Sequence, residues 1–156
     1  MIIVRIALKK YASTLFAPGF AGRWNSEGKK VIYTAGSVSL ATMENMTYRK
    51  GYGFNHDYAI MLIDLPDSLP ITTYTADNLP KGWNNPFDYA VGQSIGDRWY
   101  LAMETPVLKV PSAVVPQEYN YVLHTLHPGF SKIKLIAVTG YVPDPRIEDI
   151  LKTYPH

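Results

Sequence analysis

Six segments rich in apolar, β-branched and aromatic residues recur along the chain, and they limit the folds open to it. Their sequences are IIVRIAL, KKVIYTA, YAIMLIDL, PVLKVPSAV, EYNYVLHT and IKLIAVTGYV, at residues 2–8, 29–35, 58–65, 106–114, 118–125 and 133–142. Two longer helical patterns interrupt the series. We therefore expect an α+β domain with a central, mostly antiparallel sheet and a few flanking helices.

The helical patterns have recognisable ends. Ser37 suits the N-cap of a helix over residues 38–50, which the glycines that follow would end. A second helix is expected within residues 87–104, although two glycines weaken its pattern. The segment 69–86 predicts a short edge strand and a loop, and Asp144-Pro145 predicts the start of a short C-terminal helix.

Length and composition exclude several classes of protein. A chain of 156 residues predicts one domain that covers residues 1–156. The net charge of +2 is too weak to predict a nucleic-acid or membrane surface, so neither partner is expected. The absence of cysteine excludes disulfides, thiolate metal sites and cysteine nucleophiles. Because no signal-peptide pattern opens the sequence, a cytoplasmic location is expected.

Glu44 is the residue that most needs an explanation. At about 100° per residue, Leu40 and Thr47 lie within about 20° of each other, and Glu44 lies about 40° away. Glu44 is therefore on or beside the apolar stripe of its helix. A carboxylate placed there costs free energy unless something uses it. The alternative is a glutamate at the edge of the stripe that reaches water or pairs with a lysine, and periodicity does not decide between them.

The residues that precede Glu44 favour a functional role. Arg23 lies in a loop that leads into the strand carrying Tyr33, and Glu44 follows after one strand-to-helix turn. Because a strand and the helix that follows it are adjacent in space, we expect Tyr33 and Glu44 to face one cleft. Arg5 is a second guanidinium, in an otherwise apolar strand, and a charge there needs an anion, either within the protein or from a ligand.

These side chains match the parts of NAD⁺. Arginine forks bind a pyrophosphate through bidentate, charge-assisted hydrogen bonds. An aromatic face stacks on a flat heterocycle, and better still on a cationic one. A single carboxylate holds a ribose hydroxyl and stabilises positive charge at the anomeric carbon during glycosidic cleavage. The set therefore favours NAD⁺ as the substrate. Its nicotinamide leaving group is already activated, so its departure needs no general acid.

Two sequence blocks resemble a known family. The block GRWNSEGKKVIYTAGSVSLATMEN is similar to the signature of the RES domain family, named for its arginine, glutamate and serine. The block IGDRWYLAMETPVLKVPSAVVPQEYNYVLHTLHPGF resembles the family's Gly-Asp-x-Trp turn, Val-Pro-Ser-Ala strand and Leu-His-Pro-x-Phe turn. The resemblance runs from Arg5 to at least Phe130. One departure is His124-Thr125, where many relatives have Asn-Pro.

The resemblance implies a fold related to ADP-ribosyltransferases of the diphtheria-toxin type. It also implies a toxin of a bacterial type II toxin–antitoxin pair that consumes NAD⁺ by hydrolysis or phosphorolysis, or in some members transfers ADP-ribose to a protein. The implied partner is an Xre-type antitoxin that blocks the NAD⁺ pocket. A homodimer within a larger toxin–antitoxin complex is a further expectation.

The resemblance also assigns roles to individual residues. It implies catalytic roles for Glu44, Arg23 and Tyr33, and it implies NAD⁺ binding by Arg5, Arg23, Tyr33, Ser112 and Asn120. Without the family, Ser112 would be read as a turn residue after Pro111, and with it a ligand hydrogen bond is preferred to a nucleophilic role. No metal site is expected, because the pair His124 and His127 has no nearby acid and is typical of structural histidines.

Three alternatives to an NAD⁺-depleting toxin remain open from sequence. A toxin that transfers ADP-ribose to a host protein would break the same glycosidic bond, so the residues do not separate the two. An RNA-cleaving toxin would need a basic groove or a histidine pair at a ribose hydroxyl, against which the weak net charge argues. A catalytically silent module that only binds its antitoxin would keep the fold without the reaction.

Overall fold

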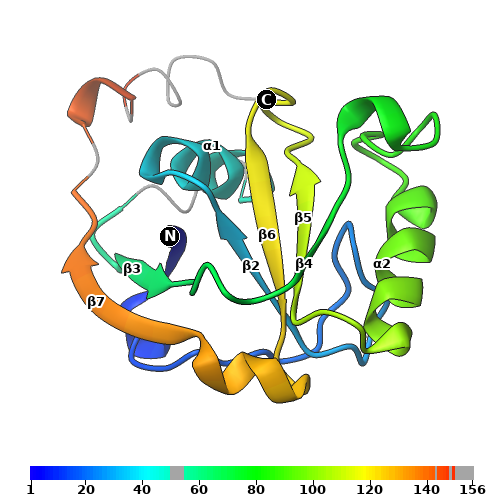
Figure 1. Ribbon diagram of the computed structural model, residues 1–156. Helices are drawn as coiled ribbons and strands as arrows, with labels where there is room; N and C mark the ends of the chain where they lie inside the picture. The colour runs from blue at the N-terminus through cyan, green and yellow to red at the C-terminus, as the bar shows by residue number, and fades with distance from the viewer. Residues whose placement is uncertain (50–54, 143, 148, 150–156) are drawn as a thin grey trace.

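The computed structural model describes residues 1–49, 55–142, 144–147 and 149. Within them, seven strands form one sheet in the order β4-β5-β6-β2-β1-β3-β7 (Figure 1). The strands are β1 Ile2–Leu8, β2 Val31–Ala35, β3 Tyr58–Asp64, β4 Ile71–Thr73, β5 Val107–Pro111, β6 Tyr119–His124 and β7 Lys134–Gly140. The helices are α1 Val38–Tyr48 and α2 Ala90–Ala102, with short 3-10 turns at Lys9–Tyr11, Ala76–Asn78 and Pro128–Lys132.

The expected sheet type is confirmed. Strands β4 and β5 pair in parallel, and the other neighbouring strands pair antiparallel. The edge strand expected within 69–86 is β4, and the start expected for the C-terminal helix is present, since residues 145–147 are helical. The first helix ends at Tyr48, two residues before the predicted end, while Lys50 and the glycines beyond it lie outside the described residues.

The sheet bends between its two central strands. Strands β1 and β2 share a single register pair, Val4 with Ala35, whereas β1 pairs with β3 along its whole length. One core cluster takes buried side chains from both sides of this bend, including Ile3 and Met61 on one side and Ile32 and Leu123 on the other. The sheet is therefore folded around a common apolar interior.

Both helices pack on the opposite face of the sheet. Leu40 and Ala41 of α1 cover Val4 and Ala35, while α2 packs its buried side chains on β5 and β6. In Figure 1 the two helices stand on either side of β2, β6 and β5. Side chains that leave these strands on this face therefore lie between α1 and α2.

Helix α1 begins as predicted, since the hydroxyl of Ser37 accepts a hydrogen bond from the amide of Leu40 at 3.1 Å. Its buried residues are Leu40, Ala41 and Asn45, so the buried face is rotated away from Thr47, which is exposed. The small side chain of Ala41 lets this face approach the sheet. Glu44 is half-buried beside this face.

The glycines of α2 are the reason that this helix packs where it does. A side chain at Gly92 or Gly96 would collide with backbone carbonyls of segment 22–26. From the same side of the helix, Gln93 donates to the carbonyl of Gly22 at 3.0 Å, and Asp97 accepts from the amide of Ser26 at 2.9 Å. The glycines that weaken the helical pattern therefore bring α2 into backbone contact with the loop that carries Arg23.

His124 is a structural residue, as predicted. Its ring stacks on Tyr100 with centroids 3.8 Å apart, and its Nδ1 accepts from the amide of Leu126 at 3.3 Å. The proton is therefore on Nε2, which donates to the Tyr100 carbonyl at 3.1 Å. Burial, helped by the nearby His127, lowers the pKa of His124, so the ring stays neutral.

Replacement of Gly96 by alanine should destabilise the fold. The added methyl group has no room against the Trp24 carbonyl, and the strain should lower the free energy of unfolding by about 1–3 kcal/mol. Urea unfolding of the two proteins measures the difference. Gly140→Ala is the matched control, because a side chain there meets open space. Equal losses from both substitutions would contradict the packing argument.

Stability should also fall on mild acidification. The pKa of His124 is lower in the folded chain than the value of about 6.5 of an unfolded one, so the unfolded state binds its proton first. Stability is therefore full above pH 6.5 and declines as the pH falls from there. Thermal unfolding between pH 7.5 and 5 should show this decline in wild type and in His56→Gln. It should be flatter in His124→Gln, and an unchanged slope in that variant would contradict the assignment.

Candidate active site

Glu44 lies at the centre of a polar cluster where α1 meets the β5–β6 hairpin. Its Oε1 accepts one hydrogen bond from the Ser112 hydroxyl at 2.7 Å and another from the Asn120 side-chain amide at 2.5 Å. Its Oε2 accepts no hydrogen bond in the part of the chain that the structure describes. The carboxylate is thus held by one oxygen and free to contact a ligand with the other.

Ser112 holds Glu44 through a hydroxyl group that makes all the hydrogen bonds it can. The residue is completely buried, and besides donating to Glu44 it accepts from the amides of Val114 at 3.0 Å and Val115 at 2.9 Å. The turn after Pro111 is therefore real, and it aims the hydroxyl at the carboxylate. The hydroxyl donates its hydrogen bond to Glu44, and both of its acceptor positions are occupied. It is therefore not set up as a nucleophile.

The same hairpin holds the beginning of α1. The Ser37 hydroxyl donates to Oε2 of Glu118 at 2.9 Å, and the carbonyl of Glu118 accepts from the amide of Ser112 at 2.9 Å. Glu118 is not among the residues that the sequence predicts for the site. Its position two residues before Asn120 was an available signal, because alternation along an extended chain gives both side chains the same face.

Tyr33 adjoins this cluster on the same face of the sheet. It stands two residues before Ala35, which is the register partner of Asn120. Its hydroxyl accepts from the amide of Trp24 at 2.9 Å and donates to Oδ1 of Asn25 at 2.7 Å. Burial raises the pKa of Tyr33, so the hydroxyl stays neutral. The hydroxyl fixes the loop beside Arg23, and the ring packs against the core cluster that includes Trp24.

Arg23 lies at the other side of Tyr33, against the loop that precedes α2. Its Nη1 donates to the carbonyls of Trp83 at 3.0 Å and Asn85 at 2.8 Å, and the guanidinium lies over the Tyr89 ring at 4.5 Å. No carboxylate pairs with Arg23 among the described residues. Its charge is oriented but not neutralised. The contact with Tyr89 has no signature in the sequence.

Arg5 is separated from these residues. Its neighbours Ile3 and Ala7 belong to the interior core cluster, while Val4 packs beneath α1, so strand alternation turns Arg5 toward the interior. Its Nη1 donates to the Phe16 carbonyl at 3.2 Å. Burial, and to a lesser extent Arg49, lower the pKa of Arg5. The structure thus brings Glu44, Ser112 and Asn120 together, places Tyr33 and Arg23 beside them, and leaves Arg5 on the other face.

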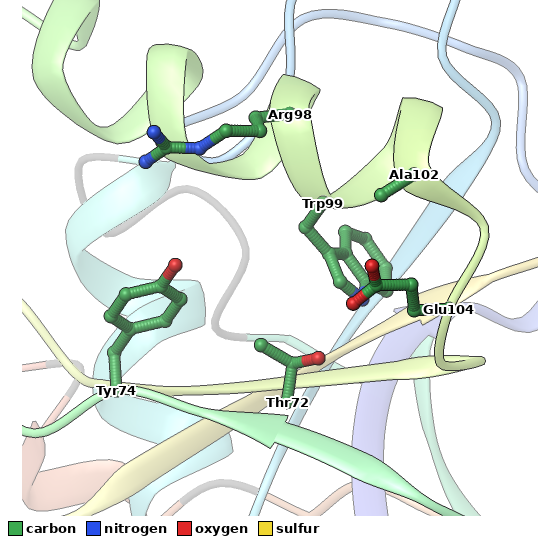
Figure 2. A pocket seen from close by; sticks show the side chains of 6 residues that line it. All are labelled: Thr72, Tyr74, Arg98, Trp99, Ala102 and Glu104. Carbon is green, nitrogen blue, oxygen red and sulfur yellow. The ribbon is translucent and has the colours of Figure 1, made fainter.

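A separate hollow of about 220 Å³ lies between α2 and the edge strand β4. Figure 2 shows its lining side chains, which are Thr72, Tyr74, Arg98, Trp99, Ala102 and Glu104. None of the six residues predicted from sequence to form the site lines it. The described residues contain no cluster of three side chains that could hold a metal ion, and none of their helices combines the length and the apolar character of a membrane span.

Comparison with known proteins identifies the family of the chain. The RES domain model matches residues 2–147. A protein named Toxin Res from Photorhabdus laumondii is 33% identical over 136 residues, which cover 85% of this chain and 86% of that protein. A Prs ADP-ribosylating toxin from Sphingobium sp. is 33% identical over 128 residues, covering 81% of this chain and 80% of that protein.

A solved structure shares the fold. The crystal structure of the M. tuberculosis MbcT–MbcA toxin–antitoxin complex contains a chain that superposes with a TM-score of 0.73 at 18% identity, covering 98% of this chain and 89% of that one. Together with the match over residues 2–147, this decides the family. The chain belongs to the RES domain family, and its α+β fold is the ADP-ribosyltransferase-like fold that the family resemblance implies.

Proposed function

We propose that this protein is the toxin of a bacterial toxin–antitoxin system and depletes cellular NAD⁺ by cleaving its nicotinamide–ribose bond. The observation that carries the proposal is the geometry of Glu44, with one carboxylate oxygen held by Ser112 and Asn120 and the other free. Membership of the RES family and relatives named as toxins support it.

Glu44 would act on the charge that forms when the bond breaks. The electron pair of the carbon–nitrogen bond leaves with nicotinamide, which becomes neutral, and positive charge remains on the anomeric carbon and ring oxygen. A fixed carboxylate stabilises that charge without reorganising. A water or phosphate oxygen then bonds to the carbon, and a proton of water or of the attacking phosphate is released to solvent.

The neighbouring residues would bind the rest of the substrate. The guanidinium of Arg23, held by the carbonyls of Trp83 and Asn85, would attract the pyrophosphate, and the ring of Tyr33 would contact the nicotinamide. Ser112 and Asn120 would act chiefly through Glu44. Arg5 remains a proposed phosphate ligand, and it would reach the substrate only at the bend, where β1 and β2 separate after Val4.

The partner and assembly follow from the same proposal. A structural neighbour is part of a toxin–antitoxin complex, which supports an antitoxin as the partner of this chain. We propose that this antitoxin is of the Xre type and covers the NAD⁺ site, that the toxin forms a homodimer within the complex, and that it acts in the cytoplasm. Light scattering of the purified toxin, alone and with its antitoxin, tests the assembly.

A protein ADP-ribosyltransferase is the second candidate, and one relative carries that activity in its name. The two functions share Glu44 and differ in the acceptor. If NAD⁺ depletion is correct, labelled NAD⁺ incubated with toxin and a cell lysate should yield free ADP-ribose or its phosphate and no labelled protein. A labelled protein band that appears only with active toxin would favour transfer instead.

Glu44→Gln should abolish the reaction and keep the fold. The amide oxygen of glutamine still accepts from Ser112 and Asn120, but the negative charge is lost, so nicotinamide release should fall by about 100-fold or more. Chromatography of NAD⁺ incubated with and without inorganic phosphate measures the release and identifies the co-product. Unfolding temperatures should agree within about 2 °C, since the replaced side chain keeps its hydrogen bonds.

Glu104→Gln is the matched control for the loss of a carboxylate, because Glu104 lies at the separate hollow beside β4. It should release nicotinamide at the wild-type rate. Full activity of Glu44→Gln would remove the proposed mechanism. Inactivity of the wild type with water, phosphate and lysate alike would favour the silent antitoxin-binding module.

A further inference from the structure

Side chains tie α1 to the β5–β6 hairpin at two places, and Glu44 makes the contacts at only one of them. At the other place, the Ser37 hydroxyl donates a hydrogen bond to the carboxylate of Glu118. Ser37 and Glu44 are seven residues apart, or about two helical turns, so they lie on nearly the same side of the helix. The hairpin therefore contacts this side of α1 at its N-cap residue and again about two turns later.

We infer that Glu118 is a positioning residue for Glu44, and that it acts through Ser37 to fix the rotation and height of α1 above the hairpin. This inference rests on the proposed function, because it assigns a further residue to the same reaction. A helix anchored at one point can turn about that point, whereas two anchors along one side prevent the turn. Without Glu118, Glu44 alone would make the side-chain hydrogen bonds to the hairpin, and the start of the helix would keep only the backbone bond from Gly36 to the carbonyl of Tyr119.

The local hydrogen bonds separate this role from simple capping. The Ser37 hydroxyl accepts from the Leu40 amide and donates its own proton to Glu118, so the cap does not need the carboxylate. The hairpin turn does not need it either, because Ser112 and Val115 bond to the backbone of Glu118. Within the described part of the chain, the Glu118 side chain thus hydrogen-bonds to the N-cap of α1 alone, and its removal should leave both elements formed.

Substitution of Glu118 tests the inference. In Glu118→Ala, kcat for nicotinamide release should fall by about 10- to 100-fold, as a displacement of about 1 Å predicts, while KM changes less than about twofold. Glu118→Gln should retain kcat within about threefold, because its amide oxygen still accepts from Ser37. Glu104→Ala is the control for loss of a glutamate outside the site, at the separate hollow beside β4. An unchanged kcat in Glu118→Ala, or an equal fall in Glu118→Gln, would overturn the inference.

A second measurement does not depend on catalysis. The side-chain amide of Asn120 gives NMR signals that report its hydrogen bond to Glu44, and Asn120→Asp assigns them by their absence. These signals should move toward those of a free amide in Glu118→Ala and stay in place in Glu118→Gln. Unmoved signals in Glu118→Ala would overturn the positioning role. A wild type that releases no nicotinamide would instead refute the proposed function, and the NMR result would still decide about Glu118.

Discussion

The hydrogen bonds from Ser112 and Asn120 to Glu44 are the interaction on which the site depends. Charge-assisted hydrogen bonds of this kind contribute about 1.5–3 kcal/mol each, and a half-buried carboxylate without donors would carry a desolvation cost of its own. They explain why a glutamate is tolerated beside the buried face of α1. They also join a helix to a hairpin that is distant in sequence, so the local folding of either element alone does not create the site.

The second half of the site is built by close backbone packing. Helix α2 lies against segment 22–26 because Gly92 and Gly96 have no side chains, and the Tyr33 hydroxyl holds the same segment from the sheet. Arg23 is therefore fixed from three directions: by α2, by the sheet, and by the carbonyls that its own guanidinium binds. The guanidinium of Arg23 and the carboxylate of Glu44 lie on one face of the sheet, and each is held in place by hydrogen bonds.

Much of this could be predicted from the sequence, and the failures have physical causes. Alternating and apolar runs located the strands, and Ser37 located the start of α1, because these signals are local. Periodicity placed Glu44 beside the buried face but could not supply its partners, which are 68 and 76 residues away. Arg5 and Arg23 are alike in sequence, but strand alternation turns Arg5 to the other face of the sheet, and its role as a phosphate ligand stays a prediction. Glu118 and Tyr89 were missed because their partners are set only by tertiary packing.

The single register pair between β1 and β2 has a consequence for how the molecule tolerates change. Where two strands share a long ladder, backbone hydrogen bonds fix the angle between them. Here that angle is left to the side chains in the interior, such as Ile3 and Leu123, which fill the space inside the bend. A change of one methylene group in that space would alter the angle between the two parts of the sheet. Relatives that differ in core volume should therefore differ in the angle at which β1 meets β2.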